Sequence, residues 1–245
     1  MKLKPKSYRG DRAFTLVEML VVIAIIAAIA AVSFMVVGRI RSSANAATSA
    51  SNIRQLYVGN QLYLSEYNEF PGDSNWGSSI VQAENTVGCT SWYERIAPLI
   101  GLGSDLEQTQ KLFVPGKIPP GILKVPGRNR VMGEKGDFRS GYARNPQINQ
   151  NNMKLPPVSF KTLTPFSRPT ATYFLIDIGG ESPKTDYNGW EISKDARLKW
   201  PAHGGKPSTL SGNVVVCYMD GSVGSPKKGD LPSDYNDIFW KAPTE

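Results

Sequence analysis

Residues 19–37 read MLVVIAIIAAIAAVSFMVV, a run of nineteen residues in which only Ser33 carries a polar side chain. At 1.5 Å per residue, a helix of this length spans about the hydrocarbon core of a membrane. The run follows five basic residues, which are Lys2, Lys4, Lys6, Arg9 and Arg12. By the positive-inside rule they place the N-terminus in the cytoplasm. The sequence therefore predicts a single transmembrane helix, with everything after about Arg39 on the extracytoplasmic side.

Glu18 stands at the start of this apolar run, between Val17 and Met19. A carboxylate at the centre of a membrane helix costs on the order of 2.5–3.5 kcal/mol on insertion scales, and less near the edge. One interpretation is that Glu18 simply reaches the headgroup region. The other is functional, because an acid inside a membrane segment generally marks a site with a partner.

The residues Ala13-Phe14-Thr15-Leu16-Val17-Glu18 resemble the processing site of type IV prepilins and type II secretion pseudopilins. The resemblance implies that a prepilin peptidase cuts between Ala13 and Phe14, and that the new N-terminal Phe14 is methylated. Family members usually carry Gly before the cut, and Ala13 is also small. Glu18 becomes the fifth mature residue, where the family places an acid that pairs with the terminal amine of a neighbouring subunit during assembly.

An ordinary secretory signal peptide is the alternative for the same segment. Ala28-Ile29-Ala30 offers a small-residue cleavage site, so that a mature chain would begin at Ala31. Against this, Glu18 would interrupt the apolar region, and the run continues to Val37. The alanines at 24, 27, 28 and 31 form pairs four residues apart, which permit close helix packing and are also common in any apolar helix.

The helix is predicted to continue past Gly38 to about Tyr67, because no proline occurs before Pro71. From about Asn52 an apolar face recurs at helical spacing: Ile53, Leu56, Tyr57, Tyr63, Leu64 and Tyr67. Gly38 and Gly59 are predicted as flexible points. Pro71-Gly72 marks a turn after the helix. A short helix is predicted within residues 92–100 and a strand within residues 141–145.

The C-terminal part carries strand patterns. Residues 172–177, TYFLID, and 213–219, NVVVCYM, are rich in β-formers, and Asp220-Gly221 followed by Ser222-Val223 predicts a hairpin. Together with HGG at residues 203–205, the stretches RPTATYFLID and NVVVCYMDGSV resemble the C-terminal region of a large group of proteins with pseudopilin-type leaders. Residues 206–212 look like an inserted loop relative to that group.

His203 is the sole histidine, and Asp177 and Asp220 lie near predicted turns. A catalytic His–Asp pair also needs a nucleophile and an oxyanion site. The sequence contains no GxSxG, HExxH or P-loop motif. We therefore expect no enzyme, and we expect the imidazole of His203 to hydrogen-bond the nearby strand ends.

Two further candidate sites follow from residue chemistry. Cys89 and Cys217 are far apart in sequence and belong to no metal motif, so that a disulfide in an exported domain and two buried free thiols both stay open. Calcium is the cofactor considered, since major pseudopilins often bind it in a C-terminal loop and carboxylates are suitable ligands. The calcium candidates are Asp220, Asp230, Asp234 and Asp237, whose spacing matches no established calcium loop, and an exposed acidic tail is the alternative.

The net charge of +7 first suggests nucleic acid as a partner. However, five basic residues and Asp11 precede the apolar run, and the rest of the chain retains only +3. Its basic residues are scattered, with Lys227-Lys228 the single Lys/Arg doublet after residue 13. A DNA-binding competence pilin would need a clustered basic patch. The charge distribution therefore argues against nucleic acid.

We predict an α+β fold, in which a long N-terminal helix, membrane-spanning in its first half, packs on a small antiparallel sheet with extensive loops. The expected organisation is a leader (1–13), a transmembrane and assembly helix (14–38), an amphipathic extension (39–70) and an extracytoplasmic globular domain (71–245). The family resemblance implies a filament subunit whose partners are other pilins, the prepilin peptidase and an inner-membrane assembly platform. The alternative is a monomeric, membrane-anchored binding or surface protein that uses the leader for export.

Overall fold

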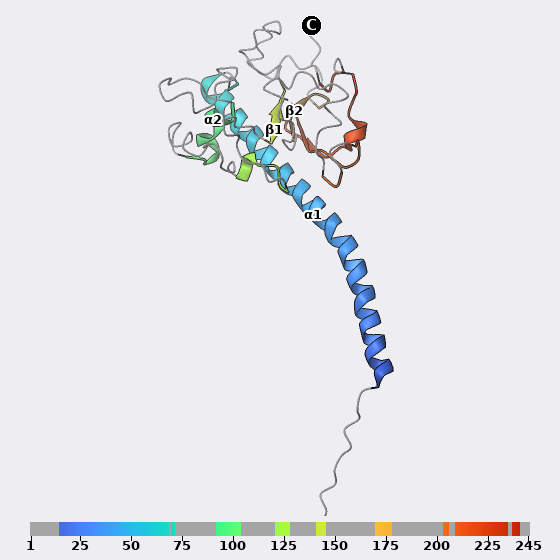
Figure 1. Ribbon diagram of the computed structural model, residues 1–245. Helices are drawn as coiled ribbons and strands as arrows, with labels where there is room; N and C mark the ends of the chain where they lie inside the picture. Colours follow the sequence, from blue (N-terminus) through green and yellow to red (C-terminus); the bar gives the residue numbers. More distant parts are fainter. Residues whose placement is uncertain are drawn as a thin grey trace, which may run out of the picture. The chain divides into compact units, whose positions relative to one another are not determined.

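The structure is a computed structural model of the chain of 245 residues (Figure 1). It describes residues 15–68, 70–71, 92–103, 121–127, 141–145, 170–177, 203–205, 209–234 and 237–240. Contacts along the chain divide it into two compact units, Met1–Arg41 and Ser42–Glu245. Helix α1 contributes to both units, and each unit is described by itself.

Helix α1 extends over Leu16–Tyr67 without interruption. This confirms the long N-terminal helix, although Phe14, where it was expected to begin, lies outside the described residues. The helix ends at Tyr67 because Asn68 adopts a left-handed backbone conformation, with φ of 57°. The amide of Asn68 still donates to the carbonyl of Leu64 at 2.8 Å. The helix thus stops before Pro71, whose missing N–H was the predicted reason for its end.

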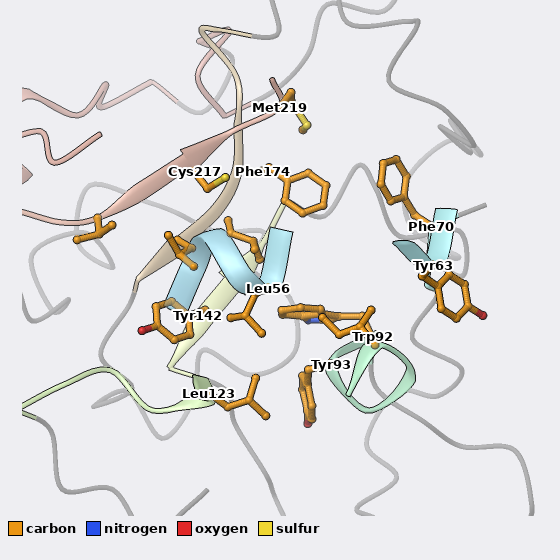
Figure 2. Packing of buried hydrophobic residues seen from close by; sticks show 14 of the residues in the cluster. Leu56, Tyr63, Phe70, Trp92, Tyr93, Leu123, Tyr142, Phe174, Cys217 and Met219 are labelled. Atoms are coloured by element: carbon orange, nitrogen blue, oxygen red, sulfur yellow. The ribbon is translucent and has the colours of Figure 1, made fainter. Parts of the chain in front are cut away.

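The second half of α1 buries one face in the Ser42–Glu245 unit. Ile53 and Leu56 are fully buried, and Tyr63 is nearly so. Figure 2 shows labelled members of the surrounding cluster, which include Phe174 and Cys217 from the strands. Full burial of one Leu or Ile side chain stabilises a fold by roughly 1.5–3 kcal/mol. The apolar periodicity from Asn52 onward therefore predicted a real packing face, although Tyr67, the last residue of that predicted face, is 53% exposed.

The sheet has four antiparallel strands in the order β1-β2-β3-β4. Their bounds are Tyr142–Arg144, Tyr173–Asp177, Val216–Tyr218 and Val223–Gly224. Strands β3 and β4 form the hairpin that was predicted at Asp220-Gly221. Gly221 has φ of 84°, a conformation that glycine adopts without strain. The sequence therefore located each of these strands, and the α+β class is confirmed.

The continuous apolar run around β3 is explained by two covered faces of the sheet. Val215 and Cys217 belong to the cluster that contains Leu56. Val214 and Val216 belong to a second cluster with Leu231, Phe239 and Trp240 from the C-terminal segment. Alternate residues along a strand point to opposite faces, so that both sets need a partner. The sequence pattern did not indicate that Leu231, Phe239 and Trp240 supply the second cover.

Short elements complete the described part. The helix expected within residues 92–100 is confirmed as α2, Trp92–Ile96, followed by the 3-10 turn η2, Pro98–Ile100. Two further 3-10 turns are η3, Gly121–Leu123, and η5, Lys228–Asp230. Gly59, which was predicted as a flexible point, is instead a close-packing residue. A Cβ atom there would lie 2.6 Å from Cγ2 of Ile100.

Candidate functional site

The N-terminus of α1 is closed by a reciprocal pair of side chains. The backbone amide and the hydroxyl of Thr15 both donate to Oε2 of Glu18, at 2.8 and 2.9 Å. The backbone amide of Glu18 donates in turn to the hydroxyl oxygen of Thr15 at 3.3 Å. This is a capping box, which satisfies amides that a helix N-terminus leaves without partners. Ala13 and Phe14, the predicted cleavage pair, lie outside the described residues.

The first half of α1 exposes almost all of its large apolar side chains. Ile23, Ile29 and Phe34 are 63%, 62% and 82% exposed. Among the described residues, α1 is the one helix long and apolar enough to cross a membrane, and none of its most apolar window is buried. Among the residues that the structure describes, this surface therefore has no protein cover. Lipid or other protein chains would have to provide it, because water solvates it poorly.

A second polar site lies inside the Ser42–Glu245 unit, at the end of strand β2. The carboxylate of Asp177 is 1% exposed, and its Oδ2 atom lies 2.8 Å from Nε2 of His203. The same oxygen accepts a hydrogen bond from the hydroxyl of Ser49 on α1 at 2.9 Å. A buried carboxylate needs such donors, because its desolvation is otherwise costly. We call Ser49, Asp177 and His203 the carboxylate clasp.

Two more side chains extend the clasp to strand β1. The hydroxyl of Tyr142 lies 3.2 Å from the hydroxyl of Ser49 and accepts from Nδ2 of Asn52 at 3.2 Å. Burial raises the pKa of Tyr142 to about 12, although its hydrogen bonds to Ser49 and Asn52 oppose the shift. The tyrosine is thus neutral near pH 7. The network connects α1 with strands β1 and β2 and with the loop that contains His203.

The two glycine motifs of the C-terminal part also contact α1. A Cβ atom on Gly204, the first glycine of HGG, would lie 3.0 Å from Oγ of Ser42. A Cβ atom on Gly221, in the hairpin, would lie 2.7 Å from the ring of Tyr57. The hydroxyl of Tyr57 donates to the carbonyl of Met219 at 3.0 Å. Both motifs therefore let loops approach the helix closely, and both loops hold its second half.

The clasp is built for hydrogen bonding and lacks the geometry of a nucleophilic catalyst. Ser49 and His203 both contact the same carboxylate oxygen, whereas a nucleophilic serine needs the imidazole as its own base. Ser49 is also fully buried. The expectation that His203 hydrogen-bonds a strand end is confirmed, because Asp177 is the last residue of β2.

The four calcium candidates do not come together as one ligand set. Oδ1 of Asp220 accepts from the amide and the hydroxyl of Ser222, and Oδ1 of Asp237 accepts from the amide of Phe239. Asp230 and Asp234 are exposed. Among the residues that the structure describes, no group of three or more His, Cys, Asp and Glu side chains could hold a metal ion.

Cys217 is a fully buried cysteine on β3 and forms no disulfide within the described residues. Burial, with a smaller contribution from the charge of Asp220, raises the pKa of its thiol to about 12. A thiol with so high a pKa is a poor nucleophile at neutral pH. Cys89 lies outside the described residues, so the pairing of the two cysteines stays a prediction.

Sequence reasoning missed Ser49 and Asn52 as members of the clasp network. Both residues lie in or next to residues 42–51, a stretch of Ser, Ala, Asn and Thr for which the sequence predicted no site. A signal was available in the spacing, because 49, 52, 53 and 56 fall on one helix face. Polar residues that continue the line of a buried apolar face are candidates for buried hydrogen bonds.

Comparison with known proteins identifies the N-terminal segment. A model of the prokaryotic N-terminal methylation motif matches residues 8–34. This is the prepilin-type motif of pilins and pseudopilins, and the resemblance of the N-terminal segment to prepilins is therefore confirmed. In general, the motif implies processing by a prepilin peptidase and assembly with other pilin-like subunits, and the apolar helix fits membrane anchoring. Searches of curated proteins and of solved structures found no significant match.

Proposed function

We propose that the chain is a structural subunit of a type II secretion pseudopilus or a type IV pilus-like filament. Prepilin peptidase cuts between Ala13 and Phe14, Phe14 is methylated, and an inner-membrane platform adds the subunit to the filament. One observation carries the proposal: the prepilin-type motif coincides with an exposed apolar half-helix that has the acid Glu18 in its first turn. In this proposal the chain consists of a leader (1–13), a transmembrane and assembly helix (14–38), an amphipathic extension of the helix (39–70) and an extracytoplasmic globular domain (71–245).

The chemistry of the half-helix supports assembly. Its apolar side chains need a cover, which the bilayer supplies before assembly and neighbouring helices supply afterwards. Ala24 and Ala28, four residues apart, would permit close approach of such helices. Cleavage before Phe14 creates a cationic amine. A carboxylate such as Glu18 can neutralise this amine where water is excluded.

In the proposed subunit, the carboxylate clasp attaches the second half of α1 to the sheet. Asp177 joins Ser49 on α1 to His203 next to the sheet, and Tyr57 joins α1 to the hairpin carbonyl of Met219. These bonds, together with the buried face around Leu56, hold the second half of the helix to the sheet.

The test uses two substitutions at Glu18 with different consequences. Glu18→Gln keeps an amide oxygen for the capping box but removes the charge, whereas Glu18→Ala removes both. Filaments are sheared from cells and quantified against the total subunit. We expect both variants to lose sheared filament, while the matched control Glu66→Gln, on the exposed surface of α1, assembles like the natural chain. Normal assembly of Glu18→Gln would contradict a charge-pairing role.

A second function is supported by the capping box itself. Thr15 and Glu18 satisfy each other within one chain, so that Glu18 has a local role without any neighbour. On this account the protein is a membrane-anchored monomer with an extracytoplasmic binding or surface domain. A natural chain that stays monomeric in the membrane and never appears in the sheared fraction would favour it.

A further inference from the structure

Two exposed arginines follow the apolar half of α1 directly. Arg39 and Arg41 stand after Gly38, at the end of the Met1–Arg41 unit. Arg39 lies 21 residues beyond Glu18, which corresponds to roughly 31 Å of helix at 1.5 Å per residue. This length is close to the thickness of a hydrocarbon core, about 30 Å. A bilayer with Glu18 at one interface therefore has the arginines at the other.

The positions of the arginines around the helix axis indicate the kind of partner. Each residue of an α-helix turns by about 100°, so that Arg39 and Arg41 point to nearly opposite sides. A protein partner docked on one side of the helix would reach only one of them. A headgroup layer surrounds the helix and offers phosphate to both. The geometry thus favours a lipid surface over a single protein contact.

We propose that Arg39 and Arg41 form an arginine girdle that binds phospholipid phosphates at the extracytoplasmic face and fixes the depth of the helix. This proposal rests on the membrane orientation in the proposed function. A guanidinium presents a planar fork of N–H donors that matches phosphate oxygens. Basic residues are normally depleted on this side of a membrane, and an interfacial contact gives them a reason to be there.

The experiment measures the contact itself. The full chain, with ¹³C at the arginine Cζ atoms, is reconstituted in vesicles of phosphatidylethanolamine and phosphatidylglycerol, and ¹³C–³¹P dephasing is recorded by solid-state NMR. We expect Arg39→Gln and Arg41→Gln each to lose part of the dephasing, and the double variant to lose both parts. Arg54→Gln is the matched control, since Arg54 is an exposed arginine further along the same helix; it should leave the dephasing unchanged.

Several results would overturn the girdle. Dephasing that is unchanged in the double variant, or that depends on one arginine alone, would contradict it. Lost filament assembly in the double variant without any arginine–phosphate dephasing would assign the arginines to a protein partner instead. Failure of the proposed function is seen separately: normal dephasing in a chain that never forms filaments would leave the girdle standing and favour the anchored monomer.

Discussion

Helix α1 has a continuous backbone from Leu16 to Tyr67, yet its two halves carry opposite surfaces. In the first half Ile25 is 54% exposed, whereas in the second half Ile53 is completely buried. The more apolar half is the uncovered one. Burial within a chain therefore follows from the presence of a packing partner, and the first half has no such partner among the described residues. This difference separates the assembly and anchoring surface from the part that builds the domain.

The largest expected effect comes from the same substitution made in each half. Ile53→Ala should lower the free energy of unfolding of the Ser42–Glu245 unit by about 2–5 kcal/mol, because a fully buried side chain leaves a cavity. Ile25→Ala should leave that free energy unchanged. Urea unfolding of the full chain in detergent, followed by tryptophan fluorescence, measures both. Equal effects of the two variants would contradict the contrast between the halves.

Asp177→Ala tests the clasp that holds the second half of α1. The substitution removes the shared acceptor of the Ser49 hydroxyl and the His203 imidazole. It should lower the free energy of unfolding of the Ser42–Glu245 unit by about 2–3 kcal/mol. Asp230→Ala, at an exposed carboxylate, is the control and should stay within about 0.5 kcal/mol of the natural chain. The same urea titration applies. A clasp variant as stable as the control would mean that the network does not stabilise the fold.

Glycine substitutions sharpen the comparison further. A Cβ atom at Gly59 meets Ile100, so that Gly59→Ala should destabilise the folded unit by about 1–3 kcal/mol through overpacking. At Gly38 a Cβ atom has no neighbour within 4 Å. Gly38→Ala should therefore leave the unit unaffected. Thermal unfolding followed by near-UV circular dichroism compares the two variants. A Gly59→Ala variant more stable than the natural chain would contradict overpacking and show that α2 and η2 can shift away from the added methyl group.

The smallest expected effect is a decrease in the stability of the folded unit at alkaline pH. Cys217 has a thiol pKa of about 12 in the folded unit, above the ordinary value of 9.0. Its contribution to stability is fully present below about pH 9 and is lost as pH rises toward 12, because the unfolded chain releases the proton first. Reduced protein should lose about 1 kcal/mol between pH 9 and pH 10. The free energy of unfolding of Cys217→Ala should fall less steeply over the same pH range. An identical fall in the variant and the natural chain would show that the Cys217 thiol is not the cause.

Much of the fold could be predicted from local patterns. The nineteen-residue apolar run, the spacing of Ile53 and Leu56, and Asp220-Gly221 each depend on neighbours in sequence. The clasp could not be predicted, because Ser49 and Asp177 are 128 residues apart and meet only in the folded unit. The role of Gly59 was misjudged for the same reason. A glycine in a helix looks flexible until the opposing Ile100 is known.

The N-terminus of the mature protein tests the central claim most directly. Protein purified from membranes or sheared filaments is analysed by N-terminal sequencing and intact mass spectrometry. The account predicts a chain that begins at Phe14 and carries one methyl group on its terminal amine. A chain that begins at Ala31, or one that retains Met1–Ala13, would contradict it.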